Sequence, residues 1–417
     1  MAATTAISQQ EALAGLATIT GPGHAEIAGN LVRVAPANAE EIAQVLRFAN
    51  ASGLSVVPTG SRSKLNWGNQ VEPNVELSLE RLNTMREHAW EDLTCTVQVG
   101  CSWAAMQREL ASHGQMVALD PLWPERSTVG GIVATNDSGA LRFRYGGLRD
   151  LIIGMTVVLA DGTIAKTGGK VVKNVAGYDL HKLLTGSFGT LGIITEVNFR
   201  LHPIEQHTRT FTATASEVSA FTRPLGDLTH SQMTLSSIQL RVAQGQAALD
   251  VRISTRLECF DDHIARLRSI INPISLAEAT ESPWQARQSL FSVPGSTLVK
   301  ASMLPSEICS VAAELERIAD AKNVELDLVA QACGLLTIAL TPTDEPSADA
   351  LFALIDHLRV RLRPTGGSAV LLQVPAVFRG RIDVWDCQSD ALPLMREVKH
   401  RFDPKRVLSP GRFVGGI

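Results

Sequence analysis

Residues 58–64 combine the residue types that can bind a phosphate group, and they directly follow a short apolar stretch typical of a strand. The proline sets the exit from the strand, the glycine permits a tight turn, and the small residues leave several backbone N–H groups pointing one way. Such a nest of amides binds phosphate oxygens, here with help from side-chain hydroxyls and two cations. Taken by itself, this segment is equally well explained as an ordinary surface turn. The candidates are Pro58, Thr59, Gly60, Ser61, Arg62, Ser63 and Lys64.

A second candidate segment covers residues 120–139. Its Thr-Val-Gly-Gly stretch precedes an Ile-Val-Ala run, which suits a helix start whose N–H groups face an anion. Polar residues after that run add hydrogen-bond donors and acceptors. The first glycine would border the path of a diphosphate, so Gly130→Val is expected to abolish binding and spare the fold. The candidates are Asp120, Thr128, Gly130, Gly131, Ala134, Asn136, Ser138 and Gly139.

The stretch from residue 141 to 150 is dense in arginine. Arg142, Arg144 and Arg149 lie within eight positions of one another, and such density beside glycines suits a bound anion. Structural ion pairs with nearby aspartates are the equal alternative. Tyr145 could cover an aromatic ligand, although tyrosines pack under loops more often.

Glycine is concentrated between residues 100 and 192, which hold 15 of the 32 glycines in the chain. Glycine is used where the backbone takes a positive φ or approaches a ligand closely. The concentration therefore indicates a site, and its last part is Gly186-Ser-Phe-Gly189-Thr-Leu-Gly192-Ile-Ile. From this part the candidates are Gly189, Gly192, Ile193 and Ile194.

Composition argues against several other classes of site. The net charge is −4, from 38 basic and 42 acidic side chains, whereas a nucleic-acid-binding protein usually has a basic excess. Six isolated cysteines and scattered histidines form no C-x-x-C or H-E-x-x-H pattern, so no metal site is expected. The spacings of a P-loop and of a Rossmann fingerprint are absent. The longest nearly apolar run is far shorter than the ~20 residues that span a membrane, and no secretory signal is expected.

Alternating strands and helices must position these segments. Leu31–Val34 reads as a strand, a helix starts after Asn38 and stops at Gly53, and Leu54–Pro58 returns as a strand. Such a β-α-β unit has parallel strands. A second unit of the same kind is predicted from residues 94–99, 102–112 and 116–119. A hairpin around Asp161-Gly162, a short helix at 179–184 and a strand at 191–201 follow.

From about residue 206 the pattern changes. A strand, a helix, a two-stranded hairpin and a second helix occur in this order twice, with starts at 209 and 297 for the strands and at 260 and 347 for the last helices. This repeat predicts one antiparallel sheet with helices on one face, built as two split β-α-β halves. The predicted divisions are a first domain at 1–205, an α+β cap domain at 206–385, and a C-terminal segment at 386–417 that returns to the first domain.

The whole array resembles the FAD-binding domain of the vanillyl-alcohol-oxidase/p-cresol-methylhydroxylase (PCMH-type) superfamily. The likeness rests on residues 58–64, Thr128-Val-Gly130-Gly131, Arg144-Tyr145-Gly146 with Arg149-Asp150, and Gly189-Thr-Leu-Gly192-Ile193-Ile194-Thr-Glu196. Within it, the chain is similar to the family of FAD-binding E-type subunits of bacterial glycolate oxidases. That likeness rests on Lys173–Leu180, on Leu184-Thr-Gly186-Ser187, and on Phe402-Asp403-Pro404 with Pro410-Gly411-Arg412.

The resemblance implies an α+β fold, with a PCMH-type FAD-binding domain of two α/β subdomains and an antiparallel-sheet cap. FAD would lie extended between the subdomains, with its pyrophosphate and ribityl chain at residues 58–64 and 128–139. Its adenine end would meet Ile193 and Ile194, and the cap would cover the isoalloxazine ring. Arg144, Tyr145 and Arg412 belong to the implied cofactor site. The turn at 58–64 holds no histidine or cysteine, so a covalent flavin through it is not expected.

The resemblance also implies a function as the FAD-binding subunit of a glycolate (2-hydroxy acid) oxidase or dehydrogenase complex. Relatives that oxidise D-2-hydroxy acids carry an H-x-G-D-G-N segment and metal-binding histidines, and this chain has neither. No catalytic base is identified, so a larger flavoprotein subunit would oxidise the small 2-hydroxy acid, and an iron–sulfur subunit would accept electrons. A free-standing FAD-dependent 2-hydroxy-acid oxidoreductase and a non-catalytic structural subunit are the alternatives. The expected location is the cytoplasm, with any membrane contact made by a partner.

Overall fold

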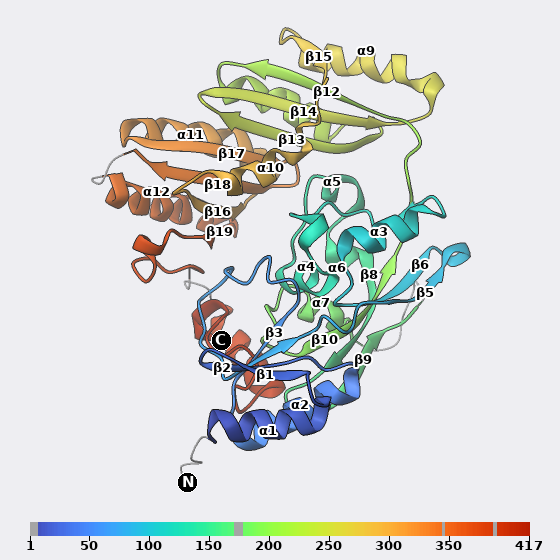
Figure 1. Cartoon of the computed structure of the whole chain (residues 1–417). Helices are drawn as coiled ribbons and strands as arrows, with labels where there is room; N and C mark the ends of the chain where they lie inside the picture. The colour runs from blue at the N-terminus through green and yellow to red at the C-terminus, as the bar shows by residue number, and fades with distance from the viewer. Residues whose placement is uncertain (1–6, 171–177, 344–346, 387–389) are drawn as a thin grey trace. The chain divides into compact units, whose positions relative to one another are not determined.

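The computed structural model describes residues 7–170, 178–343, 347–386 and 390–417, without the side chains of residues 347 and 348. The chain divides into two compact units (Figure 1). Residues 171–177, which carry most of the Lys173–Leu180 motif, lie outside the described residues. The first unit comprises Met1–Ser138, Gly147–Ile204 and Cys387–Ile417, and the second comprises Gly139–Gly146 and Glu205–Asp386.

The first unit begins with a four-stranded sheet in the spatial order β1-β2-β4-β3. The predicted β-α-β unit is confirmed: β2 and β3 both run parallel to β4, which lies between them. Asn38 starts the helix as predicted, because its side chain accepts a hydrogen bond from Glu41 N at 2.8 Å, and Gly53 ends it with φ +68°. The strands are β1 (Ala25–Ala28), β2 (Leu31–Val34), β3 (Val56–Thr59) and β4 (Val75–Ser78), and the helices are α1 (Gln9–Thr20) and α2 (Ala39–Ser52).

The second sheet of this unit is antiparallel throughout, in the order β5-β6-β10-β8-β9. The predicted second β-α-β unit with parallel strands is therefore wrong. The strand expected after α3 is only β7 (Gln115–Met116), which pairs with β11 (His202–Pro203) in a separate ribbon. The apolar residues that suggested a longer strand, Val117 to Leu119, are buried as irregular chain instead. The sheet consists of β5 (Met85–Ala89), β6 (Thr94–Gln98), β8 (Ile152–Val158), β9 (Ile164–Gly168) and β10 (Ile193–Arg200).

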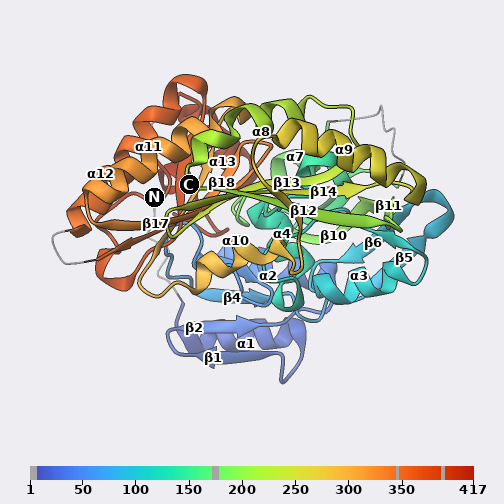
Figure 2. The ribbon, with the colours of Figure 1, turned by 90° about the horizontal axis from the view of Figure 1, so that it is seen from above.

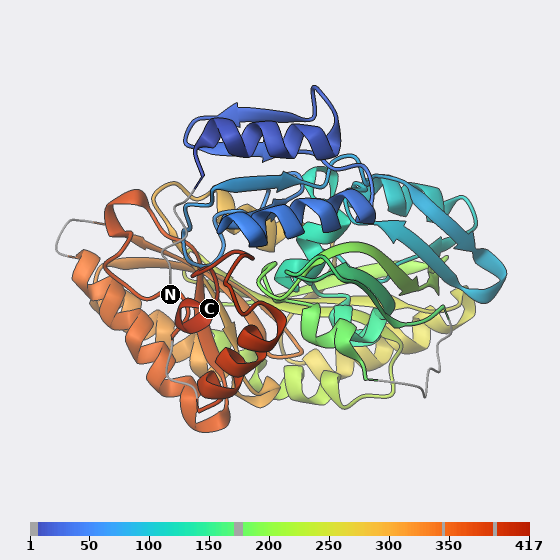
Figure 3. The ribbon, with the colours of Figure 1, turned by 90° about the horizontal axis from the view of Figure 1, so that it is seen from below.

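One hydrophobic core joins the two sheets of the first unit. Helix α1 packs against β1, β2 and α2, and α2 in turn contacts β8 and β9 (Figure 3). The Asp161-Gly162 hairpin between β8 and β9 is confirmed, with Gly162 at φ +80°. The remaining helices of this unit are α3 (Trp103–Ala111), α4 (Val129–Thr135), α6 (Leu148–Leu151), α7 (Leu180–Leu184) and α13 (Leu392–Phe402).

The second unit is the predicted antiparallel sheet, with eight strands in the order β15-β12-β14-β13-β17-β18-β16-β19. Helices α8, α9, α11 and α12 cover one face of it (Figure 2). The strands are β12 (Thr208–Ala215), β13 (Leu235–Ala243), β14 (Gln246–Ser254), β15 (Leu276–Glu278), β16 (Thr297–Ser302), β17 (Val324–Gln331), β18 (Leu335–Pro342) and β19 (Ser368–Gln373). The helices are α5 (Arg142–Tyr145), α8 (Thr222–Thr229), α9 (Phe260–Ile271), α10 (Ala286–Ser289), α11 (Ile308–Ala321) and α12 (Ser347–Leu362).

The internal repeat of the second unit is visible in its topology. Strands β12, β13 and β14 begin at 208, 235 and 246, and their counterparts β16, β17 and β18 begin at 297, 324 and 335, which is 89 residues later in each case. Each half has the order first strand, third strand, second strand, and the halves join where β13 pairs antiparallel with β17. This order of strands is the one that two split β-α-β halves would have.

Candidate functional site

The turn after β3 presents unpaired backbone amides. The N–H groups of Gly60, Ser61, Arg62 and Ser63 donate no hydrogen bond to any described residue. Arg62 adopts a left-handed conformation with φ +59°, which is uncommon for a residue other than glycine. Successive amides around a left-handed residue form a concave donor surface that suits an anion. This is the arrangement that the sequence predicted for residues 58–64.

The two cations of this turn have carboxylate partners inside the protein. The Arg62 side chain donates to Glu76 Oε1 from Nε at 2.7 Å, and Thr59 Oγ1 donates to the same oxygen at 2.8 Å. Lys64 is buried, with its Nζ 2.9 Å from Ser127 Oγ and 3.5 Å from Asp137 Oδ2. Because Arg62 and Lys64 are already paired, these two cations hold the turn in place. The backbone amides, rather than the cations, are therefore the groups that could bind an anion.

Helix α4 supplies the second wall, but not in the way the sequence suggested. Its first N–H groups are already paired: Val129 N donates to Cys101 O at 3.0 Å, and Gly130 N donates to Val99 O at 2.8 Å. The third, Gly131 N, lies 3.3 Å from the capping hydroxyl of Thr128. These amides therefore do not face a ligand, because the neighbouring strand β6 and its loop use them to anchor the helix.

The glycines of α4 differ in what they face. A Cβ atom on Gly130 would lie 2.9 Å from Val99 Cβ, whereas a Cβ on Gly131 would meet only Thr128 Oγ1, at 3.3 Å, and otherwise open space. The expectation that Gly130→Val spares the fold is thus contradicted, since the added atoms would press on a buried strand. Gly131 is the glycine whose bare surface faces the groove.

The glycine-rich loop before β10 forms the third wall. Gly189 has φ +72°, and a Cβ there would lie 2.7 Å from Pro58 Cγ, so only glycine allows this loop to approach the turn so closely. A Cβ on Gly192 would similarly meet Val157 Cγ2 at 2.5 Å. The spacing of glycines in this loop is therefore explained by backbone packing beside the groove.

The C-terminal segment completes the site. Val56 N in β3 donates to Val407 O at 2.7 Å, and Ser409 N donates back to Val56 O at 2.9 Å, which lays this segment along the free edge of the first sheet. Farther on, the guanidinium of Arg412 donates to Leu65 O at 3.0 Å. Burial lowers the pKa of Arg412 to about 10, so at neutral pH the group remains charged at the wall of the groove.

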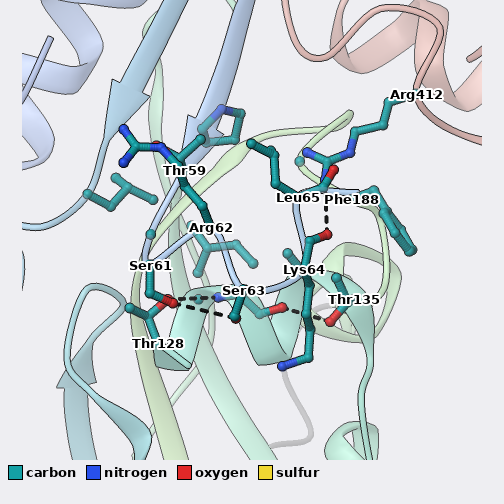
Figure 4. Close-up of a pocket in the computed structure, with 18 of the residues that line it drawn as sticks. Thr59, Ser61, Arg62, Ser63, Lys64, Leu65, Thr128, Thr135, Phe188 and Arg412 are labelled. Atoms are coloured by element: carbon teal, nitrogen blue, oxygen red, sulfur yellow. Dashed lines mark hydrogen bonds between the residues drawn. The ribbon is translucent and has the colours of Figure 1, made fainter. Parts of the chain in front are cut away.

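These four segments enclose a groove of about 710 Å³, counting its solvent-filled mouth (Figure 4). Most of the residues chosen from the sequence line it, whereas Asp120, Asn136, Ser138 and Ile193 do not, and Gly139, Arg144 and Tyr145 belong to the second unit. The predicted residues that line it are Pro58, Thr59, Gly60, Ser61, Arg62, Ser63, Lys64, Thr128, Gly130, Gly131, Ala134, Gly189, Gly192, Ile194 and Arg412.

Four lining residues were missed from the sequence: Leu65, Leu79, Thr135 and Phe188. Thr135 could have been found from helical spacing, since it follows Gly131 by four residues and its hydroxyl donates to Gly131 O at 2.7 Å. The other three are apolar, and an apolar residue after a turn carries no signal that separates a groove wall from the core.

A second, more polar hollow adjoins the groove at the same turn. It shares Ser61, Arg62, Ser63 and Thr128 with the groove, and hydroxyl groups dominate its lining, with Ser63 Oγ 3.1 Å from Ser127 Oγ. The turn therefore borders two adjoining hollows, which suits a ligand longer than a single phosphate. The further lining residues are Ser102, Glu125, Arg126 and Ser127.

In the second unit, Arg144 and Tyr145 converge on Glu205. Tyr145 OH donates to Glu205 Oε1 at 2.9 Å, and Arg144 Nη2 lies 3.2 Å from the same oxygen. Burial, followed by the hydrogen bond to Glu205, raises the pKa of Tyr145 to about 12. The predicted ion-pair alternative therefore describes Arg144, although its partner is a glutamate that the sequence analysis had not considered.

Two features are absent from the described part of the chain. No three histidine, cysteine, aspartate or glutamate side chains gather there as metal ligands would. Within the same residues, no helix has both the length and the apolar character needed to cross a membrane.

Known proteins share this architecture. A family model described as an FAD binding domain matches residues 31–168. The glycolate oxidase subunit GlcD of Bacillus subtilis is 27% identical over 415 residues, which cover 91% of this chain and 88% of that protein. A D-2-hydroxyglutarate dehydrogenase of Xanthomonas citri pv. viticola is 36% identical over 207 residues, and this match spans 47% of the chain and less than half (44%) of that protein. The structure of p-cresol methylhydroxylase with substrate bound superimposes with a TM-score of 0.73 at 15% identity, covering 97% and 96% of the two chains, and thus shares the fold.

Proposed function

We propose that the chain binds FAD non-covalently in the groove around residues 58–64 and serves as a subunit of a 2-hydroxy-acid oxidase complex. It is an FAD-dependent oxidoreductase that is similar to a glycolate oxidase subunit and to D-lactate and D-2-hydroxyglutarate dehydrogenases. The observation that carries the placement is the row of unpaired amides from Gly60 to Ser63. A diphosphate is the part of FAD that needs such donors, and no other described residue competes for these amides.

Further features of the groove fit the cofactor. The hydroxyl of Ser409 is buried without a hydrogen-bond partner among the described residues. Ser409 Oγ would lie 3.6 Å from a Cβ on Gly189, which places this unsatisfied group beside the lining of the groove. Buried polar atoms without partners are costly, so a ligand that supplies hydrogen bonds would relieve that cost.

The proposed roles follow from these contacts. The amides of residues 60–63 would bind the pyrophosphate, and the buried guanidinium of Arg412 would add a charge at the same wall. The two adjoining hollows at the turn would take the two halves of an extended molecule, with Ile194 toward the adenine. The flavin ring supplies the redox chemistry when bound. No residue of the turn at 58–64 can form a covalent flavin link, since it contains neither histidine nor cysteine.

We infer that the chain acts within a complex because electrons that leave a flavin one at a time need an acceptor such as an iron–sulfur centre. No cysteine cluster that could hold an iron–sulfur centre is visible in the sequence, so electrons would leave through a partner that has one. A larger flavoprotein subunit would oxidise glycolate or a similar 2-hydroxy acid. We place the complex in the cytoplasm, with any membrane contact made by a partner subunit.

A free-standing 2-hydroxy-acid dehydrogenase is the second candidate. It is favoured by the 36% identity to D-2-hydroxyglutarate dehydrogenase over 207 residues, although that match covers only part of the relative. In this case the chain alone would oxidise its substrate.

Purification of the chain alone separates these functions. We expect a yellow protein whose flavin is released by acid precipitation, which identifies non-covalent FAD. Glycolate or D-lactate added without oxygen should leave the flavin colour unchanged if partners carry the chemistry, whereas bleaching would favour the free-standing enzyme. A colourless protein that takes up no added FAD would contradict both and leave only a structural subunit.

A further inference from the structure

A buried lysine near the C-terminus is bonded on several sides. The side chain of Lys399, in α13, is only 6% exposed, although lysine is rarely buried. Its Nζ donates to Asp403 Oδ2 at 2.6 Å, to Thr190 O at 2.7 Å and to Leu408 O at 2.8 Å. The structure satisfies all three of its protons with acceptors from three separate segments.

Its partner Asp403 is fully buried and organises the chain that follows. Asp403 Oδ1 accepts from Val407 N at 2.9 Å, and Oδ2 accepts from Leu408 N at 2.8 Å. The carboxylate thus closes the turn between α13 and the segment that lies along β3. Burial lowers the pKa of Lys399, and the hydrogen bond to Asp403 opposes that shift, so the two charges depend on each other.

The acceptors of Lys399 belong to two different walls of the groove. Thr190 lies between Gly189 and Gly192, both of which line the groove. Leu408 directly precedes Ser409, whose N–H is bonded to Val56 O, and the same segment continues to Arg412 at the groove. One ammonium group therefore joins the glycine-rich loop to the C-terminal segment, while Lys399 itself is not among the lining residues.

We infer that Lys399 is a positioning residue for the cofactor groove: by bonding Thr190 O and Leu408 O together, it holds the glycine-rich loop and the Arg412 segment at the spacing that FAD requires. This inference rests on the proposed FAD site, and it assigns Lys399 no contact with the cofactor. A lysine suits this role because one tetrahedral group can bond three backbone and side-chain oxygens in different directions. A purely helical role would need only its charge near the end of α13.

The inference is tested by FAD affinity rather than by activity. The variant K399M leaves Asp403 charged and buried, which could prevent folding. The double variant K399M/D403N removes both charges at similar volume while still leaving Thr190 O and Leu408 O without their donor. We expect its dissociation constant for FAD, from titration of the apoprotein, to rise about tenfold. The matched control is K405M in the same segment, since Lys405 is exposed and donates only to Asn50 O at 3.3 Å; it should bind FAD as the wild type does.

A double-mutant cycle with R412M separates positioning from general stability. If Lys399 acts by placing the Arg412 segment, the variant that combines K399M/D403N with R412M should lose less FAD binding free energy than the sum of the two separate losses. Fully additive losses, or an unchanged dissociation constant in K399M/D403N, would overturn the inference. A wild-type protein with no affinity for FAD would instead refute the proposed function, and the inference with it.

Discussion

The groove of the first unit and the sheet of the second unit use opposite means to hold polar groups. The groove is made of backbone amides and bare glycine surfaces, and its nearest charged side chains are paired elsewhere. On the sheet face opposite the helices, side chains pair with one another around Asp250, which is fully buried. Asp250 accepts from Arg241 Nε at 2.6 Å, Thr212 Oγ1 at 2.8 Å and Gln239 Nε2 at 3.0 Å.

This difference determines which substitutions do harm. A site built from main chain and glycine is damaged by atoms that are added, because the new side chain fills the space meant for a ligand. A network of buried side chains is damaged by atoms that are removed, because the remaining partners lose their hydrogen bonds. The first kind of damage should appear in binding, and the second in the free energy of unfolding.

The largest effect on stability is expected from Asp250→Ala. Removing this carboxylate leaves Arg241, Gln239 and Thr212 without their shared acceptor, and we expect a loss of about 3 kcal/mol in the free energy of unfolding. Chemical denaturation followed by circular dichroism measures it. Asp262→Ala in α9 is the control, since Asp262 is exposed and should change stability little. A loss below about 1 kcal/mol for Asp250→Ala would show that the network contributes little.

Next in size is the contrast between two neighbouring glycines. Gly131→Leu projects into the groove, so FAD affinity should fall by about a hundredfold, ~2.7 kcal/mol, with little change in melting temperature. Gly130→Leu presses on Val99 and should destabilise the fold by about 1–3 kcal/mol. Thermal unfolding and FAD titration of both variants test the pair. The comparison fails if the two variants lose binding and stability in the same proportion.

The smallest effect concerns Tyr145. Its pKa is raised to about 12 by burial first and then by the bond to Glu205, so the folded state favours the neutral phenol. A folded pKa above the unfolded one gives stability that is complete below pH ~10 and is lost as the pH rises toward 12. Tyr145→Phe should therefore reduce the decline of stability in that pH window. Because Tyr145 is only half-buried, a small difference is expected between wild-type and variant unfolding curves measured at pH 9 and at pH ~11.5. If wild type and variant lose the same amount of stability between these two pH values, the raised pKa of Tyr145 is not the cause of the decline.

Local signals predicted much of this fold, whereas pairing between distant strands was harder to predict. Asn38 and Gly53 mark the ends of α2 through their own backbone and side-chain chemistry, and Asp161-Gly162 specifies its hairpin in the same local way. The repeat in the second unit was visible because each half contains its own turn signals. The partner of a strand such as β7 depends on residues 202–203 far along the chain, and nothing near β7 encodes that choice.

The candidate site shows the same division. The turn at 58–64 and the glycine loop carry compositional signals, so the residues that line the groove were mostly identifiable. The hydrogen bonds that use up the first amides of α4 come from Val99 and Cys101, and the carboxylate partner of Lys64 comes from a distant segment. Such partners appear only once the chain is folded, which is why these amides and this cation were assigned the wrong or incomplete roles.

Backbone hydrogen exchange around the turn tests the central claim most directly. Amide exchange of peptides covering residues 58–64 can be followed by mass spectrometry in the apoprotein and with saturating FAD, with α9 as the internal reference. The account predicts that FAD slows exchange at Gly60, Ser61, Arg62 and Ser63, because their N–H groups would then donate to the pyrophosphate, while α9 is unchanged. If FAD binds and exchange in this turn stays as fast as in the apoprotein, the cofactor lies elsewhere and the account is contradicted.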